Sequence, residues 1–138
     1  MRALPAVVVI ALLAAGCAGG ASPAAHGDAP VQVTERDFRI SAPRQVRAGD
    51  VRFEVHNRGP VAHEFIVVKL AGARLPLRRD GITVDEDAVE ARTAATLEPQ
   101  RAGATTDVQA RLTPGRYELL CNMAGHYRGG MHAALVVR

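Results

Sequence analysis

The stretch of sequence that decides the fold is CNMAGHYRGGM, residues 121–131 of a chain of 138. It places a thiol, an imidazole and a thioether at Cys121, His126 and Met131, with four residues in each gap. Its glycines let the backbone turn tightly, because glycine adopts positive φ without steric cost. A compact loop can therefore aim all three side chains at one point, and the stretch predicts a metal site inside the folded domain.

A fourth donor stands upstream, in the segment VAHEF (residues 61–65), where an apolar run begins. Alone, His63 would be an ordinary turn or surface histidine, but together with the C-terminal loop it completes a set of two imidazoles, one thiolate and one thioether. Soft sulfur donors beside imidazole select copper over magnesium or calcium, and a trigonal His₂Cys site with a weak axial Met is the arrangement of a blue-copper centre. The predicted ligands are His63, Cys121, His126 and Met131.

Three other donor side chains are predicted to lie outside the ligand set. His56 alternates onto the exposed phase of its strand, and His132 should point away from the site, because successive side chains of a strand face opposite sides. Met123 is too close to Cys121 along the chain to act as the axial ligand, so we expect it to pack beside the site.

The Cys-x4-His-x4-Met spacing resembles the ligand loop of the cupredoxins, the small blue copper proteins, and is closest to their rusticyanin-like and sulfocyanin-like members. By strand pattern and ligand order the resemblance covers about residues 31–138. It implies one type 1 copper ion, one-electron transfer, and passage of electrons through the C-terminal ligand histidine, His126. One departure is Glu64, which stands where many cupredoxins carry the Asn or Ser that braces the cysteine loop.

Short runs with strand-like alternation dominate the chain from residue 31 onward and predict an all-β, antiparallel Greek-key β-sandwich. A first strand begins at residue 31 and is irregular around residues 35–37. Between residues 71 and 103 the pattern changes, and Thr83 with Glu86 resembles a capping box. We therefore expect one short helix over residues 84–92, on a long connection. The other predicted strands cover residues 51–55, 65–70, 105–112, 117–121 and 131–137.

Length and charge limit the classes of protein. A chain of 138 residues has room for one core, and its formal net charge of +3 is spread along the sequence. Nucleic-acid binders carry a clustered basic patch, so we expect no nucleic-acid partner. We expect a monomer.

The N-terminal residues have the pattern of a targeting segment. Arg2 precedes the apolar residues 3–15, which are too few to span a membrane comfortably. The motif AAGC at residues 14–17 resembles a bacterial lipobox, in which Cys17 is lipidated after cleavage; the alternative is an ordinary secretory signal cut around residues 20–25. We thus predict a signal peptide over residues 1–16, a flexible linker over 17–30 and a copper-binding domain over 31–138. Either alternative exports the protein to the periplasmic or extracellular face of a bacterial membrane, with a lipid anchor in the first.

Export bears on the state of the cysteines, because the chain has only two, Cys17 and Cys121. A disulfide between them would tie the N-terminal tail to a core strand. If Cys17 is lipidated or removed, Cys121 is a lone thiol in an oxidising compartment, and a bound metal would protect it.

Three classes of function use such a site. The leading prediction is an exported electron-transfer protein whose redox partners dock near His126; the alternative is a copper-binding or delivery protein. An oxidase or reductase would need further copper sites, and in the families that the chain resembles histidines flank the type 1 cysteine. Here the flanking residues are Leu120 and Asn122, and the chain has only five histidines. We therefore predict no enzymatic activity.

Overall fold

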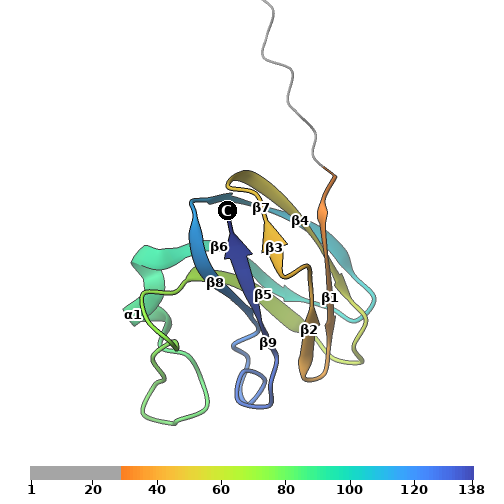
Figure 1. Ribbon diagram of the computed structural model, residues 1–138. Helices are drawn as coiled ribbons and strands as arrows, with labels where there is room; N and C mark the ends of the chain where they lie inside the picture. The colour runs from red at the N-terminus through yellow and green to blue at the C-terminus, as the bar shows by residue number, and fades with distance from the viewer. Residues whose placement is uncertain (1–28) are drawn as a thin grey trace, which may run out of the picture.

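Two β-sheets face each other in a computed structural model that describes residues 29–138. One sheet has the strand order β2-β1-β4-β7, and the other has the order β3-β9-β8-β5-β6 (Figure 1). The strands are β1 (Val31–Arg36), β2 (Arg39–Ser41), β3 (Gln45–Val46), β4 (Gly49–Asn57), β5 (His63–Lys69), β6 (Thr93–Gln100), β7 (Thr105–Leu112), β8 (Gly115–Leu120) and β9 (His132–Val137).

The predicted all-β sandwich is confirmed, but the expectation of purely antiparallel sheets is wrong. Strand β1 runs parallel to β4, and β3 runs parallel to β9; the remaining pairs are antiparallel. The reason lies in the connection between β1 and β4. After the β1–β2 hairpin the chain crosses to the edge of the other sheet as β3 and then returns as β4 in the direction of β1.

The main core lies between the two sheets and is built mostly from aliphatic side chains. Phe53 of β4 and Phe65 of β5 meet across it, with ring centroids 5.5 Å apart. The same cluster includes Cys121 and Met131, both fully buried. Two of the predicted ligands are thus part of the packed interior.

A second apolar cluster explains why β5 is apolar on both faces. Phe65 and Val67 point into the main core, whereas Ile66 and Val68 point outward. The segment between β5 and β6 covers that outer side, and its buried residues Leu75, Val84 and Val89 pack there. A strand buried on both faces has no polar alternation.

The connection between β5 and β6 differs from its prediction in two respects. The helix is shorter: α1 spans Glu86–Val89, and a 3₁₀ turn, Glu90–Arg92, follows it. Its N-cap is Asp85, whose carboxylate accepts a hydrogen bond from the backbone N–H of Ala88, so the predicted capping box is wrong. Residues Thr93–Gln100 form a strand, β6, that pairs antiparallel with β5 and was not predicted.

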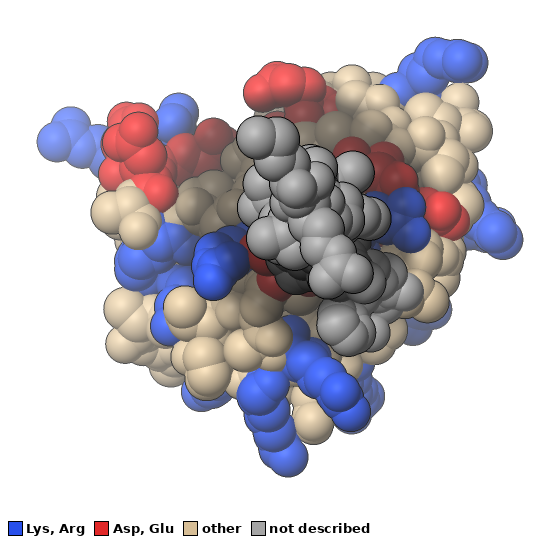
Figure 2. Space-filling view, turned by 90° about the horizontal axis from the view of Figure 1, so that it is seen from above, with Lys and Arg blue, Asp and Glu red and all other residues tan. Residues whose placement is uncertain are grey.

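The surface of the domain carries charges of both signs. Figure 2 shows Lys and Arg side chains interspersed with Asp and Glu on the face seen from above. Two charge pairs join β4 to β7: Arg52 with Asp107 at 3.3 Å, and Arg111 with Asp50 at 3.1 Å.

The predicted signal peptide and nearly all of the predicted linker, including Cys17, lie outside the described residues. Within residues 29–138, no helix is both long and apolar enough to cross a membrane.

Candidate metal centre

Three of the four predicted ligands meet at one end of the sandwich. His63 is the first residue of β5, Cys121 directly follows β8, and His126 lies in the loop between β8 and β9 (Figure 1). The Nδ1 atoms of the two histidines are 3.3 Å apart, and Cys121 Sγ is 3.4 Å from His126 Nδ1. One donor atom from each residue lies within 4.8 Å of the others, as around a single metal ion.

The fourth predicted ligand, Met131, closes the loop that carries Cys121 and His126. Its backbone carbonyl accepts a hydrogen bond from Cys121 N (3.1 Å), and its backbone N–H donates to the carbonyl of His126 (3.0 Å). The Met131 side chain is fully buried in the core cluster that includes Cys121. The four residues are arranged as in a type 1 copper site.

The turn between β1 and β2 touches both histidines. Asp37 Oδ1 lies 2.9 Å from Nε2 of His63, the ring nitrogen that faces away from the other donors. Phe38, which is 51% exposed, stands edge-on to His126 with ring centroids 5.5 Å apart. His63 is fully buried, whereas His126 is half-buried, so His126 is the histidine that reaches the surface.

Two glycines make room for these contacts. A Cβ at Gly59 would lie 2.5 Å from His63 Nε2 and 2.9 Å from Asp37 Oδ1. A Cβ at Gly129 would lie 2.8 Å from Phe38 Cδ1. At both positions the need for glycine comes from close approach.

Glu64 supplies the brace that the cupredoxin resemblance expects from Asn or Ser. Its Oε1 accepts a hydrogen bond of 2.8 Å from the backbone N–H of Asn122, directly after Cys121. Burial raises the pKa of Glu64, and the hydrogen bond from Asn122 opposes that rise. The brace therefore joins the strand of His63 to the loop of Cys121.

Asn122 joins the same loop to Val84, before α1, and to Glu86, the first residue of α1. Its side-chain oxygen accepts from Val84 N (2.6 Å), and its side-chain nitrogen donates to Val84 O (3.0 Å) and to Glu86 Oε1 (2.6 Å). Asn122 and Val84 are buried, so the two bonds between them form away from solvent. The β5–β6 connection and the metal centre are thus coupled through one side chain.

Burial controls the protonation of the donors. Desolvation raises the pKa of Cys121 to about 11, so without a metal this residue is a thiol at neutral pH. Desolvation also lowers the pKa of His63, against the opposing effect of Asp37, and this keeps the imidazole neutral and its ligand lone pair free. A metal ion must displace the proton of Cys121 to bind its sulfur.

A buried carboxyl group, Glu35 of β1, lies near the centre and was not predicted from the sequence. Its side chain is fully buried, and neither carboxyl oxygen has a hydrogen-bond partner among the described residues. Desolvation raises the pKa of Glu35 to about 8, and the negative charge of Glu64 adds to the rise. Glu35 shares the inward face of β1 with buried Val33, so the strand alternation Val31, Val33, Glu35 is a signal that could have revealed it.

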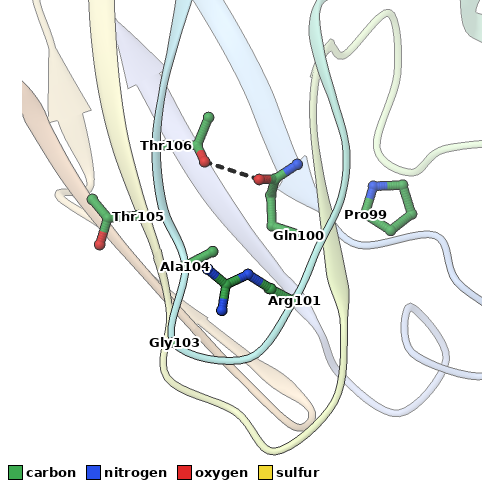
Figure 3. Close-up of a pocket in the computed structure, with 7 residues that line it drawn as sticks. All are labelled: Pro99, Gln100, Arg101, Gly103, Ala104, Thr105 and Thr106. Carbon is green, nitrogen blue, oxygen red and sulfur yellow. Dashed lines mark hydrogen bonds between the residues drawn. The ribbon is translucent and has the colours of Figure 1, made fainter.

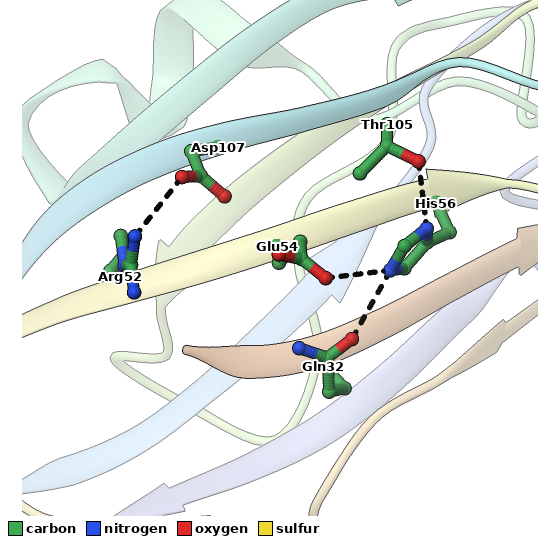
Figure 4. Close-up of polar contacts among 6 residues, drawn as sticks. All are labelled: Gln32, Arg52, Glu54, His56, Thr105 and Asp107. Carbon is green, nitrogen blue, oxygen red and sulfur yellow. Dashed lines mark hydrogen bonds and ion pairs between the residues drawn. The ribbon is translucent and has the colours of Figure 1, made fainter. Parts of the chain in front are cut away.

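The two histidines predicted to stay outside the ligand set make contacts elsewhere, and Met123 packs beside the site. His56 sits on the outer face of β4, where it bonds Thr105 (2.8 Å), Glu54 (2.9 Å) and Gln32 (3.1 Å) (Figure 4). His132 is exposed and pairs with Glu118 at 2.9 Å. Met123 is partly buried and packs against the main core, as expected.

A separate hollow of about 690 Å³ lies at the turn between β6 and β7 (Figure 3). Thr106 Oγ1 donates to Gln100 Oε1 across it, at 2.9 Å. Its lining contains no histidine, cysteine or carboxylate side chain, so it offers no metal-binding group besides amide and hydroxyl oxygens. The lining residues are Pro99, Gln100, Arg101, Gly103, Ala104, Thr105 and Thr106.

Comparisons with known proteins identify the fold. No family model matches the sequence, and no curated protein shows a significant match. Among solved structures, reduced auracyanin from the photosynthetic bacterium Roseiflexus castenholzii aligns with 79% of this chain and 96% of its own, at 18% identity and a TM-score of 0.59. Auracyanin B aligns with 80% of this chain and 91% of its own, at 21% identity and a TM-score of 0.58. Rusticyanin from Thiobacillus ferrooxidans aligns with 79% and 77%, at 16% identity and a TM-score of 0.52.

These likenesses establish a cupredoxin fold. The donor set of this chain fits one type 1 copper ion on its own chemistry: two imidazoles, one buried thiol and one buried thioether converge at one end of the sandwich.

Proposed function

We propose that the protein is an exported blue copper protein that transfers single electrons between redox partners. The observation that carries the proposal is the convergence of His63, Cys121 and His126, whose donor atoms lie within 4.8 Å of one another beside buried Met131. One of the structures that the chain resembles, rusticyanin, is described as a copper protein.

The surroundings of the donors suit electron transfer better than substrate chemistry. A bound copper ion would supply a one-electron couple, tuned by the axial ligand and by the hydrogen bonding and hydrophobicity around the cysteine sulfur. His63, Cys121 and His126 would fill the equatorial positions, and the packing around them excludes water from Cys121 and His63. A site with no free equatorial position has no place for a substrate, so we propose no enzymatic activity.

Redox partners are proposed to dock around His126. This half-buried imidazole is the ligand nearest the surface, and exposed Phe38 stands against its edge. Val61, 46% exposed, adds apolar surface in the loop that leads to His63. An apolar contact around one ligand edge brings a partner close without opening the site to water.

Copper delivery is the alternative, and burial argues against it. Passing a metal ion to an acceptor requires the incoming ligands to replace the old ones in turn. Here His63, Cys121 and Met131 are each 0% exposed, so an acceptor reaches only His126.

The deciding experiment is addition of Cu(II) to the copper-free protein while the visible spectrum is recorded. We expect one equivalent of copper to produce an intense blue thiolate-to-copper absorption. Cys121→Ser should abolish it, because a hydroxyl is a poor soft ligand. The control His56→Gln, which removes an imidazole from the outer face of β4, should keep the colour. A blue Cys121→Ser variant would exclude the proposed site.

Transfer and delivery are separated by what happens on reduction. An electron carrier should cycle between oxidation states and keep its copper in the presence of a modest Cu(I) chelator. Rapid loss of copper to that chelator after reduction would favour delivery.

A further inference from the structure

The side of His63 that faces away from the predicted copper has one polar neighbour. Nε2 is fully buried and lacks a hydrogen-bond partner that meets normal geometry among the described residues. Asp37 Oδ1 nevertheless lies 2.9 Å from it, as an ion-pair contact. In the described part of the chain, Asp37 is therefore the one group placed to hold a proton on Nε2.

The packing around this contact favours a specific role over a chance approach. Gly59 leaves space that any Cβ would fill, 2.5 Å from Nε2 and 2.9 Å from Oδ1. Asn57 Oδ1 accepts from Gly59 N (2.9 Å), and Asn57 Nδ2 donates to the carbonyls of Val61 and Gln100 (both 2.8 Å), which fixes the backbone around the contact.

The charge of Asp37 is not cancelled by a basic side chain. Among the ion pairs of residues 29–138, the partner of Asp37 is His63 alone. The Asp37 side chain is 31% exposed, so solvent screens its charge in part, whereas the His63 side chain is 0% exposed. The negative charge of Asp37 therefore lies on one side of the buried His63 imidazole, the side of Nε2.

We propose that Asp37 is a positioning residue of the metal centre: its carboxylate keeps the proton of His63 on Nε2, leaves the Nδ1 lone pair facing Cys121 and His126, and by its charge favours the oxidised over the reduced state. Carboxylates that accept from the far nitrogen of a ligand histidine fix its tautomer and raise its basicity, and their loss typically costs about 10- to 100-fold in metal affinity. The inference rests on the proposed copper function and adds a residue to it.

The first test uses the copper-free protein and needs no copper. Nitrogen-15 NMR of labelled histidine should show His63 protonated on Nε2 in the wild-type protein. In Asp37→Ala this single tautomer should give way to a mixture. A wild-type His63 protonated on Nδ1 would overturn the proposal.

The second test measures the reduction potential of the copper-loaded protein. Asp37→Asn keeps an oxygen acceptor but removes the charge, and Asp37→Ala removes both. Each should weaken Cu(II) binding relative to Cu(I), by about 10-fold or more, and each tenfold change raises the potential by about 59 mV for one electron. The matched control Asp50→Asn removes an exposed negative charge at the start of β4 and should leave the potential unchanged.

The outcomes separate this inference from the proposed function. Wild-type potentials in both Asp37 variants would overturn the role of Asp37 while leaving the copper function intact. If the wild-type protein formed no blue copper centre, the proposed function would fail, and the NMR experiment would still decide whether Asp37 sets the tautomer of His63.

Discussion

At the scale of single residues, the donors of the metal centre differ in their exposure to solvent and in their chemistry. His63 and Cys121 are shielded from solvent, and His126 alone of the three reaches the surface. Met131 joins them from the core side of the loop, where its thioether would be a weak axial donor. Because Met131 would be only a weak donor, we expect substitutions at this position to alter the reduction potential without removing the metal.

We expect Met131→Leu to keep copper bound and to raise the reduction potential, because loss of a weak donor destabilises Cu(II) more than Cu(I). Met131→Gln should lower the potential, because an amide oxygen is a harder ligand. Redox titration of the three proteins measures both shifts. Equal potentials in all three would show that Met131 is not an axial ligand.

Glu35 predicts how stability depends on pH. Its pKa in the folded protein is about 8, against 4.5 as the ordinary value, because burial disfavours the charged carboxylate. Between these two values the folded state holds a proton that the unfolded state has lost. The contribution of Glu35 to stability is therefore fully present below pH 4.5 and is lost as the pH rises to about 8, by at most about 1.4 kcal/mol per pH unit.

The measurement is urea unfolding of the copper-free protein across this pH range. Glu35→Gln cannot ionise, so its free energy of unfolding should lack the decline contributed by Glu35. Glu98→Gln, at an exposed position, should retain the wild-type decline. Parallel curves for the wild-type protein and Glu35→Gln would show that Glu35 does not carry the extra proton.

At the scale of elements, the loop after β8 is held from two sides. Glu64 of β5 bonds its backbone, and Asn122 makes two hydrogen bonds to Val84, before α1, and one to Glu86, the first residue of α1. The long β5–β6 connection is thus a support for the metal centre as well as a cover for the outer face of β5.

We expect Asn122→Ala to lower the free energy of unfolding by about 2–4 kcal/mol, because it leaves the buried N–H and C=O of Val84 without partners. Hydrogen exchange at Val84 should become faster in the same variant. Thr83→Ala, a truncation in the same segment but away from Asn122, should cost less. Slow exchange at Val84 in Asn122→Ala would mean that the segment is held by its apolar contacts alone.

Sequence patterns predicted the elements that have strong alternation or apolar runs, and they failed where a strand lies at an edge. Strand β6, Thr93–Gln100, is the edge of its sheet, so all of its residues are half-buried or exposed. Its sequence also contains Pro99. The parallel pairing of β1 with β4 depends on a crossover through β3, which is two residues long and carries no pattern of its own.

The candidate ligands were predictable because metal donors recur at fixed spacing, whereas their supports were not. Asp37 lies in a turn 26 positions before His63, and nothing in its neighbours marks it as a contact of that histidine. Glu64 was noted only as a departure from Asn or Ser, although its longer side chain still reaches Asn122 N. Contacts between distant segments depend on the fold and leave no local pattern.

At the scale of the whole molecule, the chain enters the domain at the end remote from the metal centre. Strand β1 begins at the top of Figure 1, and the loop between β8 and β9 lies at the bottom. An anchor at Cys17 would therefore attach to the domain at the end opposite His126 and leave that histidine free to meet partners.

We expect the full-length protein, made in a bacterium, to sediment with membranes and to partition into detergent. Lipidation of Cys17 would add a strong apolar anchor. Cys17→Ser should release the protein or leave an uncleaved precursor, while copper binding is unchanged. Mass analysis of the mature N-terminus measures the modification directly, and an unmodified N-terminus beyond Cys17 would show simple secretion instead.

The backbone closure of the ligand loop also bears on the order of assembly. The hydrogen bonds that tie Met131 to Cys121 and to His126 join peptide groups and use no metal-binding atom, so this closure of the loop does not require a metal. We therefore expect the protein to complete its fold first and to acquire copper later, in whichever compartment supplies the ion. Copper would then enter past the edge of His126, the ligand nearest the surface. The supply of copper need not coincide with the synthesis of the protein.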